Sequence, residues 1–158
     1  TKLDRKAAEG TDGFYEGVTY DGYKHPSIYS QLSNLCGAAD GIAAIAANNG
    51  IDCNELTKAS NGLKASISTM HDNISAIYES YSTLSGALSE FLLRLPEDQL
   101  SARELEGLEQ YRQTVDGTAS VIDEAGYNES VRSFRSTLLF PADVFMFVCG
   151  VDYPEYFS

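Results

Sequence analysis

LKASISTMHDNISAIYESYSTLSGALSEFLLRL, residues 63–95, carries the pattern that decides the fold. Its apolar residues recur at alternating spacings of four and three. That alternation places them on one face of an α-helix, and its persistence favours coiled-coil-like packing. We predict one helix from about Asn54 to Leu95, ended by Pro96 and about 60 Å long at about 1.5 Å per residue. The stripe comprises Leu63, Ile67, Met70, Ile74, Ile77, Tyr81, Leu84, Leu88, Phe91 and Leu95.

A shorter helix is expected before it. Ser27 is a suitable N-cap, and Asn48, Asn49 and Gly50 end the pattern. The segment 27–49 is rich in alanine and has Asp40 as its single charge, so we expect it to be the most enclosed helix. Its apolar stripe is Ile28, Leu32, Leu35, Ala39, Ile42 and Ala46.

A third helix is expected after the spacing of a capping box at Ser101 and Glu104. It should run to about Leu139, and Pro141 should open a short helix ending near Gly150. The stripe is Leu105, Leu108, Val115, Ala119 and Ile122, and after a phase slip near Gly126 it resumes at Val131, Phe134 and Leu138. No strong strand pattern occurs. The predicted fold is therefore all-α, an elongated antiparallel bundle of three long helices with short N- and C-terminal helical segments.

Residues 1–26 contain four glycines and are predicted to be irregular or a short helix that packs on a bundle formed by residues 27–158. We expect them to cover the half of the apolar groove that the first helix leaves open, and residues 141–149 to cap the bundle at its 49–54 end. The aromatic tail is interpreted as core, with an exposed partner site as the alternative. This tail group is Phe140, Phe145, Phe147, Tyr153, Tyr156 and Phe157.

Composition limits the function. A formal net charge of −12 disfavours binding to nucleic-acid backbones or anionic lipid surfaces. No run of about 18 apolar residues is present that would span a membrane. Because the chain begins with Thr1 rather than Met, we expect a further N-terminal segment. The three cysteines have no CxxC spacing, and Cys36 and Cys53 should lie too far apart on successive helices to pair.

Sequence motifs give no catalytic, cofactor-binding or metal-binding residues. His25 and His71 are isolated, and no HExxH, P-loop, GxGxxG or GxSxG occurs. An acidic cluster around the 95–105 turn has two interpretations: ordinary helix-start charge that complements the macrodipole, or a surface for a cation or a basic partner. The cluster comprises Glu97, Asp98, Glu104, Glu106 and Glu109.

The end of the chain resembles the closing motif of the LemA family, a YN pair followed by apolar positions, an FP step, an alanine, a glycine and a terminal YF. The matching residues are Tyr127, Asn128, Val131, Phe134, Phe140, Pro141, Ala142, Gly150, Tyr156 and Phe157. The chain departs from the family at residues 32–42, where LSNLCGAADGI lacks the usual arginine pair and proline, and it lacks the usual transmembrane helix. The resemblance implies a bacterial, membrane-anchored helical bundle on the extracytoplasmic side, without established catalytic residues. We interpret Tyr127 and Asn128 as packing and hydrogen-bonding residues, with ligand or partner recognition as the alternative.

Three functions follow as hypotheses, and of these we favour the first, with the second as the alternative. The first is a non-enzymatic interaction or scaffold module that binds unidentified, envelope-associated protein partners. The second is a ligand-sensing bundle, which needs a polar-lined pocket, for example where residues 1–26 meet the helices. The third, an enzyme, needs a cleft that holds a strongly perturbed acid or histidine.

Overall fold

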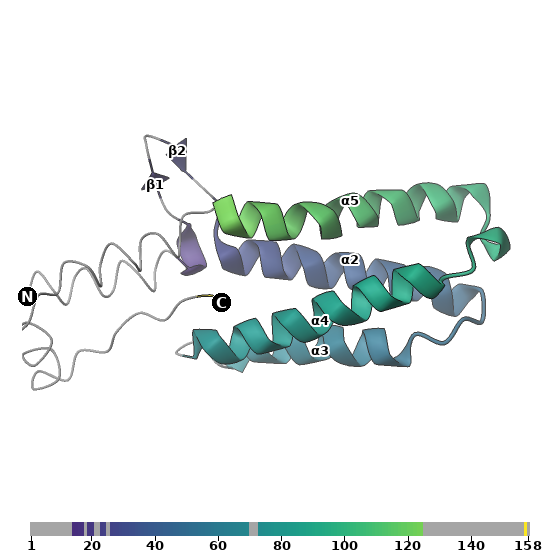
Figure 1. Ribbon diagram of the computed structural model, residues 1–158, viewed down its shortest axis with the longest axis horizontal. Coiled ribbons are helices and arrows are strands. Elements are labelled where there is room, and N and C mark those ends of the chain that lie inside the picture. The colour runs from purple at the N-terminus through teal and green to yellow at the C-terminus, as the bar shows by residue number, and fades with distance from the viewer. Residues whose placement is uncertain are drawn as a thin grey trace, which may run out of the picture.

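The computed structural model describes residues 14–17, 19–20, 23–24, 26–69, 73–124 and 157. Within them lie four long helices, which confirms the predicted all-α helical bundle (Figure 1). A pair of two-residue antiparallel strands, which the sequence did not suggest, precedes the first of these helices. The elements are β1 (Thr19–Tyr20), β2 (Tyr23–Lys24), α2 (Ile28–Asn48), α3 (Asn54–Thr69), α4 (Ile74–Arg94), the 3₁₀ turn η1 (Glu97–Gln99) and α5 (Ala102–Glu124).

Helix α2 is the centre of the bundle. It begins at the predicted N-cap, where the Ser27 hydroxyl accepts a hydrogen bond from the Ser30 amide at 3.1 Å. It packs against both α3 and α5, and all six residues of its predicted stripe are buried. Nine of its residues are buried, against five each in α3 and α4. Among these three helices it is therefore the most enclosed, as its alanine content predicts.

The single helix predicted from Asn54 to Leu95 is wrong. The chain forms two helices, α3 and α4, which pack against each other side by side (Figure 1). The hydroxyls of Ser66 and Ser80 lie 2.6 Å apart across this pair, so the chain reverses between them. Asn73 supplies the physical reason, because its side-chain oxygen caps α4 by accepting a hydrogen bond from the Ala76 amide at 2.9 Å.

The hairpin also reverses the expected course of the third helix. Helix α5 starts beside the end of α2, where Asn49 donates a hydrogen bond to Glu104, and runs back antiparallel to α2. We had expected the third helix to finish at this end and residues 141–149 to cap it there. The predicted cap by residues 141–149 depended on the third helix ending there, whereas α5 begins there. Residues 125–156 lie outside the described part of the chain. In α5, Leu108 is buried as predicted, but Leu105 is 37% exposed.

The opposite end of the bundle contains an aromatic cluster. Phe14 is fully buried, in a helical turn of residues 14–16, and Phe157 is 3% exposed. The ring centroid of Phe157 lies 5.8 Å from that of Phe14, 5.2 Å from that of Tyr78 and 5.4 Å from that of Tyr81. Two segments far apart in the sequence therefore meet on the first turns of α4.

Candidate functional site

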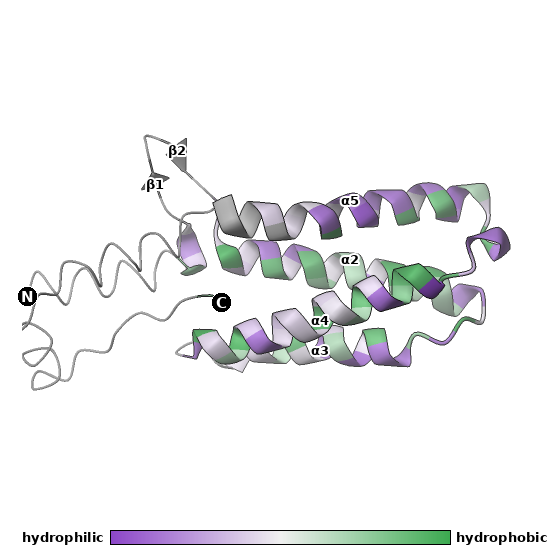
Figure 2. Cartoon of the chain, viewed as in Figure 1, coloured by the Kyte–Doolittle hydropathy of each residue, from purple (hydrophilic) through white to green (hydrophobic). Residues whose placement is uncertain are grey.

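The acidic cluster lies at the end of the bundle where one connection joins α2 to α3 and another joins α4 to α5. We call this region the loop end and define it as residues 49–55 and 91–109. It contains the α2–α3 loop, the last turn of α4, η1 and the first turns of α5 (Figure 1). In Figure 2 the last turns of α4 are strongly hydrophobic, whereas the adjacent η1 is hydrophilic. Apolar and charged surface are thus neighbours here.

Gly50 sets the path of the α2–α3 loop. Its φ of 69° is in the left-handed region that glycine adopts without strain. The Gly50 amide bonds to the Ala47 carbonyl at 3.1 Å and the Ile51 amide to the Ala46 carbonyl at 2.9 Å, which is the Schellman pattern. This turn directs Ile51 back towards α4 and so forms one wall of the loop end.

Glu104 has a structural role. Its carboxylate accepts hydrogen bonds from the Ser101 amide at 2.9 Å and the Ser101 hydroxyl at 2.6 Å, which confirms the predicted capping box. Its other oxygen accepts a hydrogen bond from Asn49 at 2.9 Å. These bonds from Ser101 and Asn49 lower the pKa of the Glu104 carboxyl below its ordinary value. The sequence indicated Asn49 only as a helix stop, and this contact between α2 and α5 was not predicted.

The other four acidic residues divide into two kinds. Glu97 forms an ion pair with Arg112 of α5, so its charge is already matched. Asp98, Glu106 and Glu109 are exposed, and their carboxylates form no ion pair or hydrogen bond within the described chain. Glu106 and Glu109 are three residues apart and therefore share a face of α5. Three of the five predicted acidic residues thus have carboxylates without a partner in the described chain.

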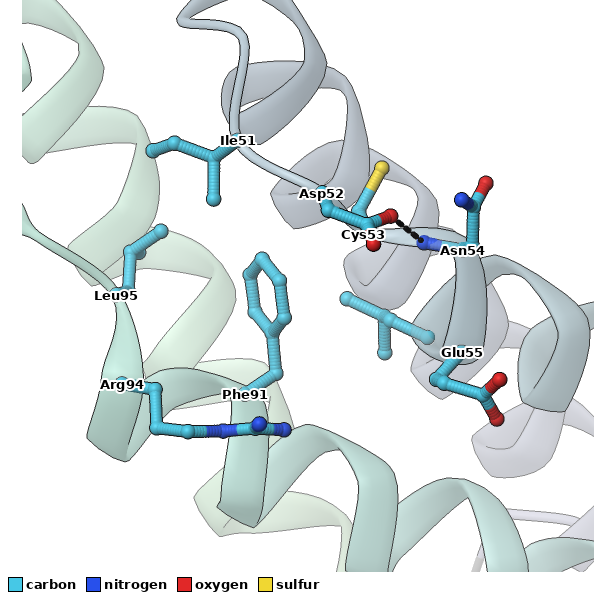
Figure 3. Close-up of a pocket in the computed structure, with 9 residues that line it drawn as sticks. Ile51, Asp52, Cys53, Asn54, Glu55, Phe91, Arg94 and Leu95 are labelled. Atoms are coloured by element: carbon cyan, nitrogen blue, oxygen red, sulfur yellow. Dashed lines mark hydrogen bonds between the residues drawn. The ribbon is translucent and has the colours of Figure 1, made fainter.

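A pocket of about 240 Å³ opens between the α2–α3 loop and the end of α4. In Figure 3 the ring of Phe91 stands in its centre, with Ile51 and Leu95 on one side and Asp52 and Cys53 on the other. The apolar side chains of Ile51, Leu56, Phe91 and Leu95 line it, together with Asp52, Cys53, Asn54, Glu55 and Arg94. No sequence motif pointed to it, because its lining comes from two helices and a loop.

The LemA-like closing motif falls almost wholly outside the described residues. This applies to Tyr127, Asn128, Val131, Phe134, Phe140, Pro141, Gly150 and Tyr156. Phe157 is described, and it is buried between the N-terminal turn and α4. At that one position the tail residue contributes to the aromatic cluster of the core.

A second polar cluster lies between α2 and α3. Asp40 accepts a hydrogen bond from Ser60 at 2.9 Å and forms an ion pair with Lys64. The nearby Cys36 thiol contacts the Ser60 carbonyl, and burial raises its pKa to about 11. A thiol with so high a pKa is protonated at neutral pH and is a poor nucleophile. This cluster therefore fixes the contact between two helices.

The described part of the chain holds no group of three or more histidine, cysteine, aspartate or glutamate residues arranged to bind a metal ion. Cys36 and Cys53 are free thiols. None of the described helices combines the length and apolar character needed to span a membrane. Both histidines lie outside the described residues.

Comparison of the chain with protein-family models, curated proteins and solved structures finds no match. The resemblance to the LemA family therefore stays a prediction, carried by the closing motif alone.

Proposed function

We propose that this protein is a non-enzymatic interaction or scaffold module that presents its loop end to a protein partner. Following the LemA resemblance, the proposal includes an N-terminal membrane anchor, an extracytoplasmic position and envelope-associated partners. The observation that carries the proposal is the state of Asp98, Glu106 and Glu109. These three carboxylates are exposed and unpaired at one bundle end, whereas Glu97 and Glu104 beside them serve the fold.

The alternative, a ligand-sensing bundle, has weaker support. The pocket of about 240 Å³ is smaller than the roughly 300–1,000 Å³ of pockets that hold drug-sized ligands. It lies at the loop end, whereas Phe14, from the described part of the N-terminal segment, lies at the opposite end of the bundle (Figure 1). Its lining combines four apolar side chains with polar groups at the mouth, which suits contact with a protein surface.

Site-specific photo-cross-linking in the native cell tests the proposal. A photo-reactive amino acid in place of Gln99, which is exposed in η1, should link reproducibly to one other protein identified by mass spectrometry. The same amino acid in place of Glu79, near the start of α4, serves as the matched control. Charge reversal at Asp98 and Glu106 should abolish the link from position 99. Equal linking from both positions would contradict a binding role for the loop end.

A further inference from the structure

The pocket at the loop end has a largely apolar lining, with the Phe91 ring at its centre (Figure 3). Phe91 is 9% exposed and Leu95 8%, and both belong to the hydrophobic core, so the pocket opens directly onto it. Ile51 is half-buried and completes the apolar wall (Figure 3). A space of about 240 Å³ with such walls suits one large apolar side chain better than a whole small molecule.

The charges at its mouth are mainly negative. Glu55 is exposed and forms no ion pair within the described chain. Asp52 uses one carboxylate oxygen to accept a hydrogen bond from the Asn54 amide at 3.0 Å and forms no ion pair within the described chain. Arg94 is the one cation in the lining, and it is paired with Glu90 on its own helix, at 3.4 Å between guanidinium and carboxylate. A basic segment that binds here would therefore meet two carboxylates without a counter-charge, those of Asp52 and Glu55, beside an apolar pocket.

We propose that this pocket receives a single large apolar side chain from a basic segment of a protein partner. The apolar anchor would enter between Ile51, Phe91 and Leu95, and flanking lysines or arginines would lie against Asp52 and Glu55. This inference rests on the proposed function, since it names the class of partner that the loop end binds. Its two components, apolar burial and charge complementarity, are separable by experiment.

The first test varies the probe. A short fluorescein-labelled peptide of lysine, glycine and serine with one central tryptophan is titrated with the protein and followed by fluorescence anisotropy. Replacing tryptophan by alanine should weaken binding by about ten- to a hundredfold, the loss expected when a buried large side chain is removed. Replacing the lysines by glutamate should abolish binding, and added salt should weaken it. Equal affinity for the tryptophan and alanine peptides, or no saturable binding of the tryptophan peptide, would overturn the proposal.

The second test varies the protein. Ile51→Trp fills the pocket and should remove the preference for tryptophan over alanine in the peptide. Leu93→Ala is the control, because Leu93 is 87% exposed and does not line the pocket. Glu55→Lys should weaken binding about tenfold, whereas Glu79→Lys, which changes the net charge equally but lies near the start of α4, should have little effect. Equal weakening by both charge reversals would show non-specific attraction and overturn the proposal.

Circular dichroism shows whether each variant folds. If Ile51→Trp does not fold, the comparison of the tryptophan and alanine peptides on the native protein still decides the question. Failure of this pocket proposal can be distinguished from failure of the proposed function. If position 99 forms photo-cross-links but the protein shows no preference for the tryptophan peptide, the interaction module stands. The proposal that the pocket binds an apolar side chain is then rejected.

Discussion

Gly41 of α2 and Tyr111 of α5 are in direct contact, with no room for a side chain at position 41. A Cβ atom built on Gly41 would lie 2.2 Å from Cζ of the Tyr111 ring. The missing side chain lets α5 approach α2 closely, and the half-buried tyrosine ring fills the space. This contact, together with that of Asn49 and Glu104, aligns the two helices.

Gly41→Ala should therefore destabilise the protein. Displacing the Tyr111 ring should cost about 1–3 kcal/mol, partly offset by the gain of about 0.5–1 kcal/mol for alanine over glycine in a helix. Urea denaturation followed by circular dichroism measures the net loss. Gly37→Ala is the matched control: the same helix has open space at that position, so the variant should be slightly more stable. If Gly41→Ala is still destabilising in a Tyr111→Ala background, the ring contact is not the cause.

The helical hairpin predicts a cross-link. Cysteines introduced by Ser66→Cys and Ser80→Cys should form an intramolecular disulfide on mild oxidation, because the two hydroxyls lie 2.6 Å apart. A continuous helix would separate these positions by about 21 Å, at about 1.5 Å per residue. Peptide mapping by mass spectrometry identifies the bridge. The pair Ser66→Cys and Thr83→Cys, with residue 83 exposed, should not cross-link.

The capping box predicts a dependence of stability on pH. Because the pKa of Glu104 is lowered in the folded protein, its contribution to stability is fully present above the ordinary, unfolded-state pKa of a glutamate carboxyl. The contribution is lost as the pH falls through the lower folded-state pKa. Glu104→Gln should therefore be less stable than the native protein near neutral pH, and the difference should shrink below about pH 4. Denaturation curves at several pH values measure this difference.

Glu106→Gln is the control for that experiment, since Glu106 is exposed and accepts no hydrogen bond in the described chain. Its stability should follow that of the native protein at every pH. An equal pH dependence of the difference for both variants would contradict the role assigned to the bonds from Ser101 and Asn49.

The aromatic cluster predicts that the tail stabilises the bundle. Phe157→Ala should lower the free energy of unfolding by about 3 kcal/mol, because it removes a buried ring from contacts with Phe14, Tyr78 and Tyr81. Thermal and urea denaturation measure the loss. Leu93→Ala, at an exposed position, should change the stability by less than about 0.5 kcal/mol. A comparably small effect for Phe157→Ala would place the ring outside the cooperative core.

Periodicity predicted which residues are buried but not where the chain reverses. Of the stripe that begins at Leu63, the described members are buried on both sides of the hairpin, apart from the half-buried Tyr81. The interval from Met70 to Ile74 happens to be four residues, so the reversal leaves the alternation in phase. The polar residues His71, Asp72 and Asn73 were the only local signal, because asparagine is a good N-cap.

The site was less predictable than the fold. Local signals, namely the capping box at Ser101 and the helix stop at Gly50, were correct because each depends on a few neighbouring residues. Contacts between distant segments were missed. Tyr111 falls at helical spacing between Leu108 and Val115, so its inward position was detectable, but its partner Gly41 was not. The pocket depends on how a loop and two helices come together, which no single segment encodes.

The course of α5 determines which end of the bundle carries the unpaired carboxylates. Phe14 and the first turns of α2 and α4 lie at one end, and the unpaired carboxylates lie at the other (Figure 1). The 21 residues of α2 separate the two ends by about 30 Å. A tether on the N-terminal side of Phe14 would therefore hold the carboxylates roughly three Debye lengths or more from the point of attachment at physiological salt. At that distance the charge of a membrane surface is largely screened and would contribute little to the electrostatic potential around the carboxylates.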